Sequence, residues 1–409
     1  MSINRPTTLG IIACPGGKVF AQEIITHLRR LYRRRWEKKV AALSHAYHIT
    51  QEEVAQNINF DLDLHTSDAS ATNNIKNYRI PELLIPTTFT RFANGEFKAE
   101  IGDSVRGMDL FIIQDLENHY PMKFPGTNEK VINSVNDHIF ALITTVDAAF
   151  QSGCESVTVV TPSYPYARQH KKKGREGLTA SRVGRILENM GVTRIITLDI
   201  HSKEIENTFR RLSLENLHGS YQILRKLKEL IDLKNPDIVV VSPDTGAVDR
   251  NKFYASALGR PLALLYKERD YSKVSQAGES NITTTKLLGD VTGKTVFMAD
   301  DMLGTGGTFI KAFKLLRDMG AKDIIAAVSL PLFSGDAIKY FDDAYAEGLF
   351  TKIIGTNAVY HEEELLGRPW YSSANVTELF AQAITRLHHN RSLSSILDNG
   401  ALIQKLLNS

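Results

Sequence analysis

Residues 296–308, with the sequence VFMADDMLGTGGT, constrain the fold of this chain more than any other segment. A run of apolar residues ends in two adjacent carboxylates, Asp300 and Asp301, and a glycine-rich turn follows. A helical pattern of apolar residues then begins at Phe309. This order predicts a buried strand, a tight loop and a helix N-terminus, which is a repeating element of α/β folds.

The same segment also predicts a ligand. Glycines let the backbone approach an anion closely, and the free N–H groups and dipole of a helix N-terminus favour negative charge there. Two carboxylates beside a phosphate site suit a ligand with both phosphate and hydroxyl groups, which indicates a sugar phosphate. The alternative is an ordinary strand-to-helix turn capped by Thr308.

Two better-known phosphate motifs do not fit. Phe309 occupies the position at which the dinucleotide fingerprint needs its last glycine. Residues 289–295, GDVTGKT, are one residue shorter than a P-loop and lead into a strand instead of a helix. We interpret this second segment as a turn.

Composition indicates a water-soluble protein of ordinary type. A chain of 409 residues predicts two or three domains, and 43% hydrophobic with 23% charged residues is usual for globular proteins. The two cysteines, Cys14 and Cys154, have neither metal-ligand nor disulfide spacing. No apolar run is long enough for a membrane span, and the start is not a signal peptide. We therefore predict a cytoplasmic protein without membrane contact.

Strand-like and helix-like segments alternate along most of the chain. Several strand candidates are continuous apolar runs, as expected for strands that are covered on both faces. Residues 133–150 and 220–231 have helical periodicity. The predicted fold class is α/β with mostly parallel sheets flanked by helices. The strand candidates are residues 110–114, 157–161, 195–198, 238–242, 262–266, 296–299, 324–329 and 353–356.

An internal repeat suggests how the domains are divided. Residues 179–191 and 308–320 both run from Thr to Met-Gly with identical spacing, and a strand with paired isoleucines follows each. We predict two related domains, residues 1–217 and 218–409, with the last helix able to pack back on the first. The alternative is a chance similarity between two amphipathic helices.

Two regions look like inserts, at about residues 32–86 and 118–128. The first begins as a basic helix and then loses its periodicity in a polar stretch, residues 59–77. Its basic run, Arg33 to Arg35 with Lys38 and Lys39, could contact nucleic acid. A solvated helix face is the interpretation we adopt, so no nucleic-acid partner is predicted.

Several segments together resemble the ribose-phosphate diphosphokinases, or PRPP synthetases. They occur in the order found in that family and cover most of the chain apart from the two inserts. They are RFANGE (91–96), SVRGMDLFIIQ (104–114), YARQ (166–169), ITLDIHS (196–202), VVVSPDTGAVDR (239–250), KERD (267–270), ADDMLGTGGT (299–308) and the tail at 379–397.

The resemblance implies two phosphoribosyltransferase-like domains and a defined reaction. Such enzymes transfer the β,γ-diphosphoryl group of ATP to the 1-hydroxyl of ribose 5-phosphate, giving PRPP and AMP for nucleotide biosynthesis. They use Mg²⁺ and act as homo-oligomers, so a hexamer or a smaller dimer-based assembly is expected. The alternatives are a non-catalytic relative that binds or regulates, and a phosphoribosyltransferase that consumes PRPP.

By the same resemblance, ribose 5-phosphate binds at the loop and at nearby charged side chains. Asp300 and Asp301 are expected to take the ribose hydroxyls, and Arg269 is expected to contribute a cation. Gly304 stands where the family has Asp, which removes one acceptor. The loop residues expected to hold the phosphate are Gly304, Thr305, Gly306, Gly307 and Thr308.

The ATP site is expected to lie on other segments. Lys267 and Arg269 are two residues apart on a strand, so both cations project to one face and suit a triphosphate; a solvated strand end is the alternative. The resemblance makes them the catalytic cations and gives His201 and Asp244 as metal ligands. His170 replaces an Asp of the family. The residues expected to bind ATP are Phe92, Asn94, Gly95, Glu96, Arg168 and Gln169, the first four in a segment that could instead be a plain hairpin turn.

Overall fold

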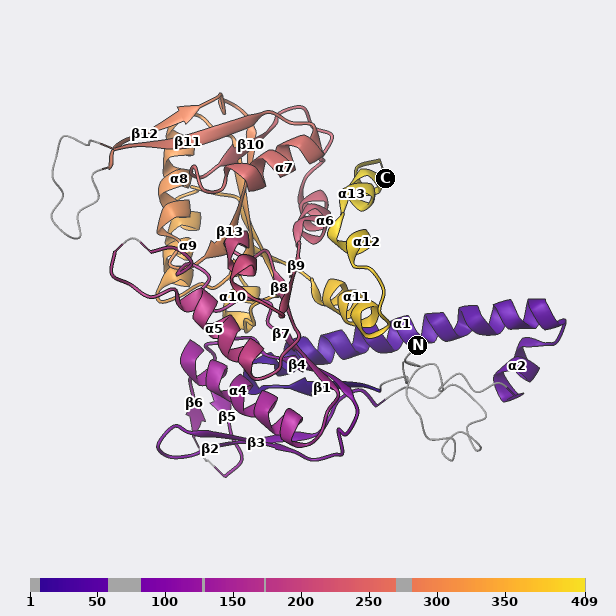
Figure 1. The fold of residues 1–409 in the computed structure, drawn as a ribbon. Helices are drawn as coiled ribbons and strands as arrows, with labels where there is room; N and C mark the ends of the chain where they lie inside the picture. Colours follow the sequence, from indigo (N-terminus) through magenta and orange to yellow (C-terminus); the bar gives the residue numbers. More distant parts are fainter. Residues whose placement is uncertain (1–7, 58–81, 127–128, 173, 270–281, 409) are drawn as a thin grey trace. The chain divides into compact units, whose positions relative to one another are not determined.

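The chain folds into two units in the computed structural model, which describes residues 8–57, 82–126, 129–172, 174–269 and 282–408 (Figure 1). Of residues 267–269 and 282–284 it describes the backbone only. The first unit comprises residues 1–217 and 377–396, and the second comprises residues 218–376 and 397–409. None of the described helices is long and apolar enough to cross a membrane.

The first unit contains a parallel sheet of five strands in the order β1-β4-β7-β8-β9. Its three central strands are buried almost throughout, which explains why their sequences are continuous apolar runs. The α/β class with parallel sheets is thereby confirmed. The strands are β1 Leu9–Ala13, β4 Asp109–Ile113, β7 Ser156–Val160, β8 Arg194–Leu198 and β9 Ser213–Leu217.

Helices α1 (Lys18–Tyr47) and α11 (Thr377–His388) pack together in this unit although they are far apart in sequence. The rings of Phe20 and Phe380 meet edge to face at 5.1 Å. The buried His388 Nδ1 lies 2.8 Å from an Asp109 carboxylate oxygen at the start of β4. The helix that returns to the first unit is therefore α11, whereas the last helix, α13 (Gly400–Asn408), belongs to the second unit.

Much of the first predicted insert is helical. Helix α1 is continuous over 30 residues, and its second half extends away from the sheet to meet α2 (Gln51–Asn57) (Figure 1). Val40 and Val54 are buried between the two helices. The predicted polar stretch at 59–77 lies outside the described residues. The other elements of this unit are hairpin strands β2 Thr87–Arg91 and β3 Phe97–Ile101, the short pair β5 Met122–Lys123 and β6 Lys130–Val131 within or beside the second predicted insert, α4 Val135–Gln151, α5 Thr179–Asn189, η1 Pro15–Gly17 and η3 Lys203–Thr208.

The second unit contains a sheet of seven strands in the order β12-β11-β10-β13-β14-β15-β16. All neighbours are parallel except β11 and the edge strand β12, which are antiparallel. The strands are β10 Ile238–Ser242, β11 Leu262–Arg269, β12 Ile282–Leu288, β13 Thr295–Leu303, β14 Asp323–Pro331, β15 Lys352–Thr356 and β16 Tyr371–Ala374. The helices are α6 Ser220–Leu230, α7 Val248–Leu258, α8 Gly307–Asp318, α9 Ala337–Ala346, α10 Glu363–Leu366 and α13, while α12 Ser394–Leu397 spans the boundary between the units.

Strand β13 separates two apolar cores. Val296 and Met298 belong to the core on one face of the sheet, and Phe297 and Ala299 belong to the core on the other. Because successive side chains of a strand point to opposite faces, a strand covered on both sides must be apolar at every position. The run ends where the polar site begins, at Asp300.

The predicted repeat has a structural counterpart at the ends of α5 and α8. Gly191 and Gly320, the glycines that follow the two Met residues, have φ of +101° and +85°. The amide of the next residue donates to a helix carbonyl in both cases, Val192 to Leu187 at 3.1 Å and Ala321 to Leu316 at 3.0 Å. The Met-Gly ending thus terminates both helices by the same glycine cap.

Candidate active site

The loop between β13 and α8 has the geometry of an anion site. Gly306 has φ of +79°, and a Cβ atom there would lie 2.2 Å from Phe341 Cε2. Only glycine fits at this position. Helix α8 begins at Gly307 without a side-chain cap, so no capping side chain competes with an anion for the amides of its first turn. Thr305, Gly307 and Thr308 are exposed, so a phosphate can reach them.

The start of this loop is held from the neighbouring segment. The Phe333 amide donates to the Leu303 carbonyl at 3.0 Å, and the Ser334 amide donates to the Gly304 carbonyl at 3.2 Å. These contacts fix the chain direction before the glycine turn. Gly304 is not among the described glycines with positive φ, so its backbone is compatible with an Asp.

The two acids at the end of β13 are paired and largely buried. The Asp301 amide donates to Asp300 Oδ1 at 2.8 Å, and the Met302 amide donates to Asp301 Oδ1 at 2.8 Å. Burial, and then the adjacent Asp301 charge, raise the pKa of Asp300 to about 7; the charge of Asp244 adds to this. Ionising both carboxyl groups of the predicted acid pair is therefore unfavourable in the folded protein.

Asp244 lies in the turn after β10, the neighbour of β13 in the sheet. Its Oδ1 accepts hydrogen bonds from the Gly246 and Ala247 amides at 2.9 and 3.1 Å. Its charge adds to the rise in the Asp300 pKa, and β10 and β13 are neighbours in the sheet. The structure thus brings together Asp244, Asp300 and Asp301, as expected at the carboxyl ends of adjacent parallel strands.

Sequence reasoning missed Asn251 in α7, which is completely buried. Its side chain makes three hydrogen bonds, two of them to Ala299, the residue before Asp300. A signal for it exists in the sequence. Asn251 has helical spacing with Tyr254, Ala255 and Leu258, so it is a polar residue on the apolar face of an amphipathic helix.

Strand β11 carries Lys267 and Arg269 and is three residues longer than predicted. Its pairing with β12 shifts register between Glu268 and Arg269. The side chains of both cations lie outside the described part of the structure, so the common face stays a prediction. Residues 282–285 form the start of β12, and residues 270–281 lie outside the described part of the structure.

In the first unit, Arg168 and Gln169 occupy an exposed turn after β7. Tyr166 has φ of +56°, and its carbonyl accepts from the Gln169 amide at 2.8 Å. Burial raises the pKa of Glu117, and the charge of Arg168 opposes that shift. The turn therefore presents a cation and an amide beside a carboxyl group, which suits a polar, anionic ligand.

His201 is exposed just after β8 and lies beside the same turn. The rings of His170 and His201 meet edge to face, with centroids 5.3 Å apart. His170 Nδ1 donates to the Ala167 carbonyl at 3.0 Å, which fixes its tautomer. His201 belongs to the first unit and Asp244 to the second, so their joint role as metal ligands stays a prediction.

The segment RFANGE forms the connection of the β2–β3 hairpin, with its Asn-Gly pair in the turn. Gly95 has φ of +92°, and the Glu96 amide donates to Asn94 Oδ1 at 3.2 Å. Phe92 is 47% exposed at the tip, unusual for a residue of its type. A turn of this kind can still present a ring to a base, so adenine binding stays a prediction.

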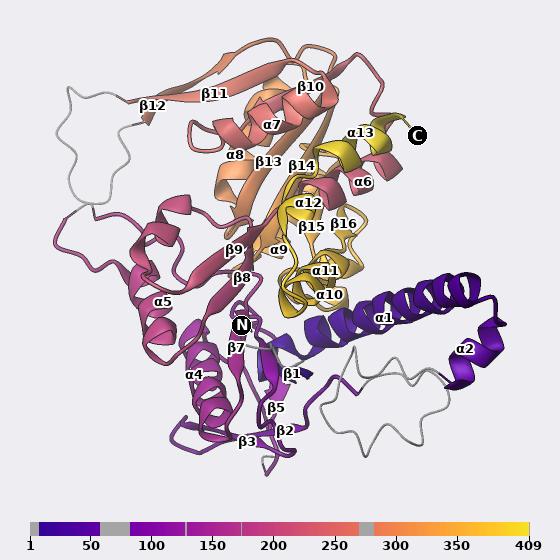
Figure 2. The same ribbon diagram turned by 45° about the vertical axis from the view of Figure 1, so that its right-hand side comes forward.

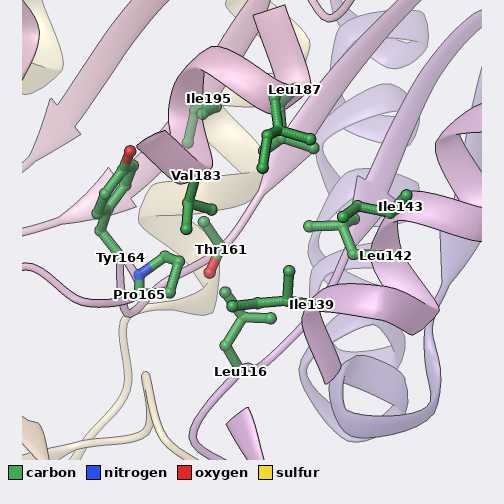
Figure 3. Close-up of a pocket in the computed structure, with 11 residues that line it drawn as sticks. Leu116, Ile139, Leu142, Ile143, Thr161, Tyr164, Pro165, Val183, Leu187 and Ile195 are labelled. Carbon is green, nitrogen blue, oxygen red and sulfur yellow. The ribbon is translucent and has the colours of Figure 1, made fainter. Parts of the chain in front are cut away.

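A small pocket in the first unit lies between α4 and α5 (Figure 3). Its lining is almost entirely apolar and includes none of the predicted site residues, so we assign it no role in the chemistry. Its walls include Leu116, Ile139, Leu142, Ile143, Val183 and Leu187.

Comparisons with known proteins agree over both units. A family model described as the N-terminal domain of ribose phosphate pyrophosphokinase matches residues 48–191, and a phosphoribosyl transferase domain model matches residues 212–364. The chain is 34% identical to the ribose-phosphate pyrophosphokinase of Helicobacter hepaticus over 314 residues, which are 76% of this chain and 91% of that protein. It is 33% identical to ribose-phosphate pyrophosphokinase A of Dictyostelium discoideum over 310 residues, 76% of this chain and 89% of that protein. The crystal structure of phosphoribosylpyrophosphate synthetase from Mycobacterium smegmatis superposes with a TM-score of 0.67 at 25% identity, covering 94% of this chain and 100% of that one.

Proposed function

The chain belongs to the ribose-phosphate pyrophosphokinase family, and we propose that it transfers the β,γ-diphosphoryl group of ATP to the 1-hydroxyl of ribose 5-phosphate. The ribose oxygen forms a bond to the β-phosphorus, and the bond between that phosphorus and the α,β-bridging oxygen breaks. The products are PRPP and AMP. No finding favours the non-catalytic alternative.

The observation that carries this proposal is the acid pair followed by an uncapped helix N-terminus in the second unit. The 5-phosphate would bind the amides of residues 305–308 and the hydroxyls of Thr305 and Thr308. Asp300 and Asp301 would accept hydrogen bonds from the ribose hydroxyls. Since the loop fixes the phosphate and the acids fix the ring, the 1-hydroxyl would be directed towards the nucleotide.

The nucleotide is assigned to groups of both units. We propose that Phe92, Asn94, Gly95 and Glu96 contact the adenine, and that Arg168 and Gln169 contact phosphate or ribose oxygens. Lys267 and Arg269 would stabilise the negative charge that develops on the transferred group and on the departing AMP, because phosphoryl-type transfers depend on positioning and charge stabilisation. The exposed positions of Phe92 and Arg168 support this assignment.

Mg²⁺ fits the residues present as an ion that arrives with the nucleotide. The described residues contain no group of three or more His, Cys, Asp or Glu side chains placed to hold a metal. Mg²⁺ keeps several waters and is commonly held by one or two protein ligands together with substrate phosphates. We propose Asp244 and His201 as those protein ligands; the bound ion would neutralise phosphate charge.

We further propose that the enzyme is a cytoplasmic homo-oligomer, a hexamer or a smaller dimer-based assembly. The hairpin tip with its exposed Phe92 would then reach a neighbouring subunit. Both cysteines are unpaired, in keeping with a reducing compartment. A native mass equal to that of one chain would contradict the oligomer.

The reaction is tested by incubating the purified protein with ribose 5-phosphate, ATP and Mg²⁺ and measuring AMP and PRPP. The proposal requires equal amounts of both products and no AMP when the sugar phosphate is omitted. Asp300→Ala serves as a matched control, since it removes a sugar contact and leaves the nucleotide groups intact. No AMP above background with several divalent ions would contradict the proposal.

A further inference from the structure

Helix α7 connects the two carboxylate positions of the second unit. It begins just after the turn that holds Asp244, and it packs on β10 and on β13, the strand that contains Asp300 (Figure 2). The registered pairing of β10 and β13 ends at Val240 and Phe297. Beyond that point β10 no longer supplies hydrogen-bond partners to β13, and a side chain of α7 takes its place.

That side chain is Asn251. Its Oδ1 accepts from the Ala299 amide at 2.9 Å, and its Nδ2 donates to the Ala299 carbonyl at 2.8 Å. Nδ2 also donates to the Ala247 carbonyl at 2.9 Å. The orientation of the amide is fixed by these partners, because a flipped amide would place a donor against a donor and an acceptor against two carbonyls.

These contacts form a continuous path between the two acids. Asp244 Oδ1 accepts from the Ala247 amide at 3.1 Å, and the Ala247 carbonyl accepts from Asn251. Asn251 in turn holds both backbone groups of Ala299, which is bonded directly to Asp300. The path is buried at Asn251 and Ala299, where water cannot replace a lost hydrogen bond without opening the structure.

We propose that Asn251 is a positioning residue that sets the spacing between Asp244 and Asp300, and thereby the binding of ribose 5-phosphate. This inference rests on the proposed function. It does not require Asn251 to touch a substrate. Its role would be to hold the end of β13 against α7 so that the two carboxylates keep one separation in the free and bound enzyme.

The principal test compares Asn251→Leu with the unaltered enzyme. Leucine has a similar volume but no hydrogen-bonding group, so it fills the site and breaks the path. We expect kcat/KM for ribose 5-phosphate to fall by about tenfold to a hundredfold, the range for a displacement on the order of 1 Å. KM for ATP should change by less than about threefold. Full retention of kcat/KM for the sugar would overturn the proposal. An equal rise in KM for ribose 5-phosphate and for ATP would also overturn it.

A matched variant separates positioning from stability. Asn399 is also a buried Asn of this unit, but its amide donates to the His218 carbonyl, away from β13. Asn399→Leu should lower the unfolding temperature without the selective loss for the sugar. If Asn399→Leu and Asn251→Leu give the same kinetic pattern, a general loss of stability explains both and the proposal fails. Should Asn251→Leu not fold, Asn251→Ser, whose single hydroxyl cannot make all three hydrogen bonds of the amide, takes its place with the same criteria.

A double-mutant comparison tests whether Asn251 acts through Asp300. Ribose 5-phosphate binding to Asp300→Asn is measured by calorimetry with and without Asn251→Leu. We expect the second change to weaken binding at least threefold less in the Asp300→Asn background than in the unaltered enzyme. Equal effects in both backgrounds would overturn the proposal. Absence of AMP formation by the unaltered enzyme would instead defeat the proposed function, so the two failures can be told apart.

Discussion

Replacing Asp300 by Asn should stabilise the second unit at neutral and alkaline pH while it damages the sugar site. The folded protein raises the pKa of Asp300 to about 7 from a reference value of 3.8, first through burial and then through the Asp301 charge. The folded state therefore binds this proton more tightly than the unfolded state does. The stability that the proton confers is fully present below about pH 4 and is lost as the pH rises towards 7.

The size of the effect follows from the shift. A difference of about three pKa units corresponds to about 4 kcal/mol at pH 8, at about 1.4 kcal/mol per unit. Asp300 and Asp301 are adjacent and repel each other, so part of this free energy is shared between the two carboxyl groups. We therefore expect Asp300→Asn to raise the free energy of unfolding by roughly 2 kcal/mol or more. At pH 5 the ionised fraction of the folded carboxyl is small, so the gain should be less than half that at pH 8.

The measurement can be confined to the second unit. The chain has two tryptophans, Trp36 in the first unit and the buried Trp370 in the second. In a Trp36→Phe background, Trp370 fluorescence follows urea unfolding of the second unit without metal or substrate. Asp237→Asn, at an exposed carboxyl of the same unit, is the matched control and should show no comparable gain. A gain that is absent at pH 8, or equal at pH 5 and pH 8, would refute the reasoning.

Three further variants test other parts of the site. Lys267→Ala should lower kcat by about a hundredfold or more and change the Kd for ATP by only a few-fold, because the contact of Lys267 strengthens in the transition state. Steady-state kinetics and calorimetry measure the two quantities. Equal losses in kcat and in ATP affinity would disprove that role. Gly304→Asp restores an acceptor at a backbone that permits it, so the Kd for ribose 5-phosphate should fall several-fold in calorimetry, and an unchanged or weaker affinity would contradict our interpretation. In Gly306→Ala the new Cβ would clash with Phe341, and alanine disfavours the φ of +79° at this position. We expect the change to destabilise the second unit by about 2 kcal/mol or more and to weaken phosphate binding. An unchanged free energy of unfolding in urea would contradict this prediction.

The fold was largely predictable because its sheets are covered on both faces. The covered parts of strands such as β10 and β13 are continuous apolar runs, residues 238–241 and 296–299, and such runs are a clear signal in the sequence. The strands that sequence reasoning missed lie at edges. β9 has only one fully buried residue, and β12 begins with a run of threonines that follows a polar stretch, although Thr favours strands.

The candidate site could be predicted where chemistry is concentrated in one segment. The acids and glycines at residues 300–308 predict an anion site, because an ordinary strand-to-helix turn needs neither two adjacent acids nor three glycines. The contribution of Asn251 could not be predicted from chemistry of that kind. Its partners are backbone groups of Ala247 and Ala299, which any sequence would supply, and only the meeting of α7 with the end of β13 shows why an amide is needed there.

Transfer of a labelled phosphate tests the proposed reaction most directly. ATP labelled with ³²P in the γ-phosphate is incubated with the protein, ribose 5-phosphate and Mg²⁺, and the products are separated by chromatography. Transfer of the intact diphosphoryl group places the label in PRPP, with one AMP formed for each labelled PRPP. Label in inorganic phosphate or in a ribose bisphosphate, with ADP in place of AMP, would contradict the reaction.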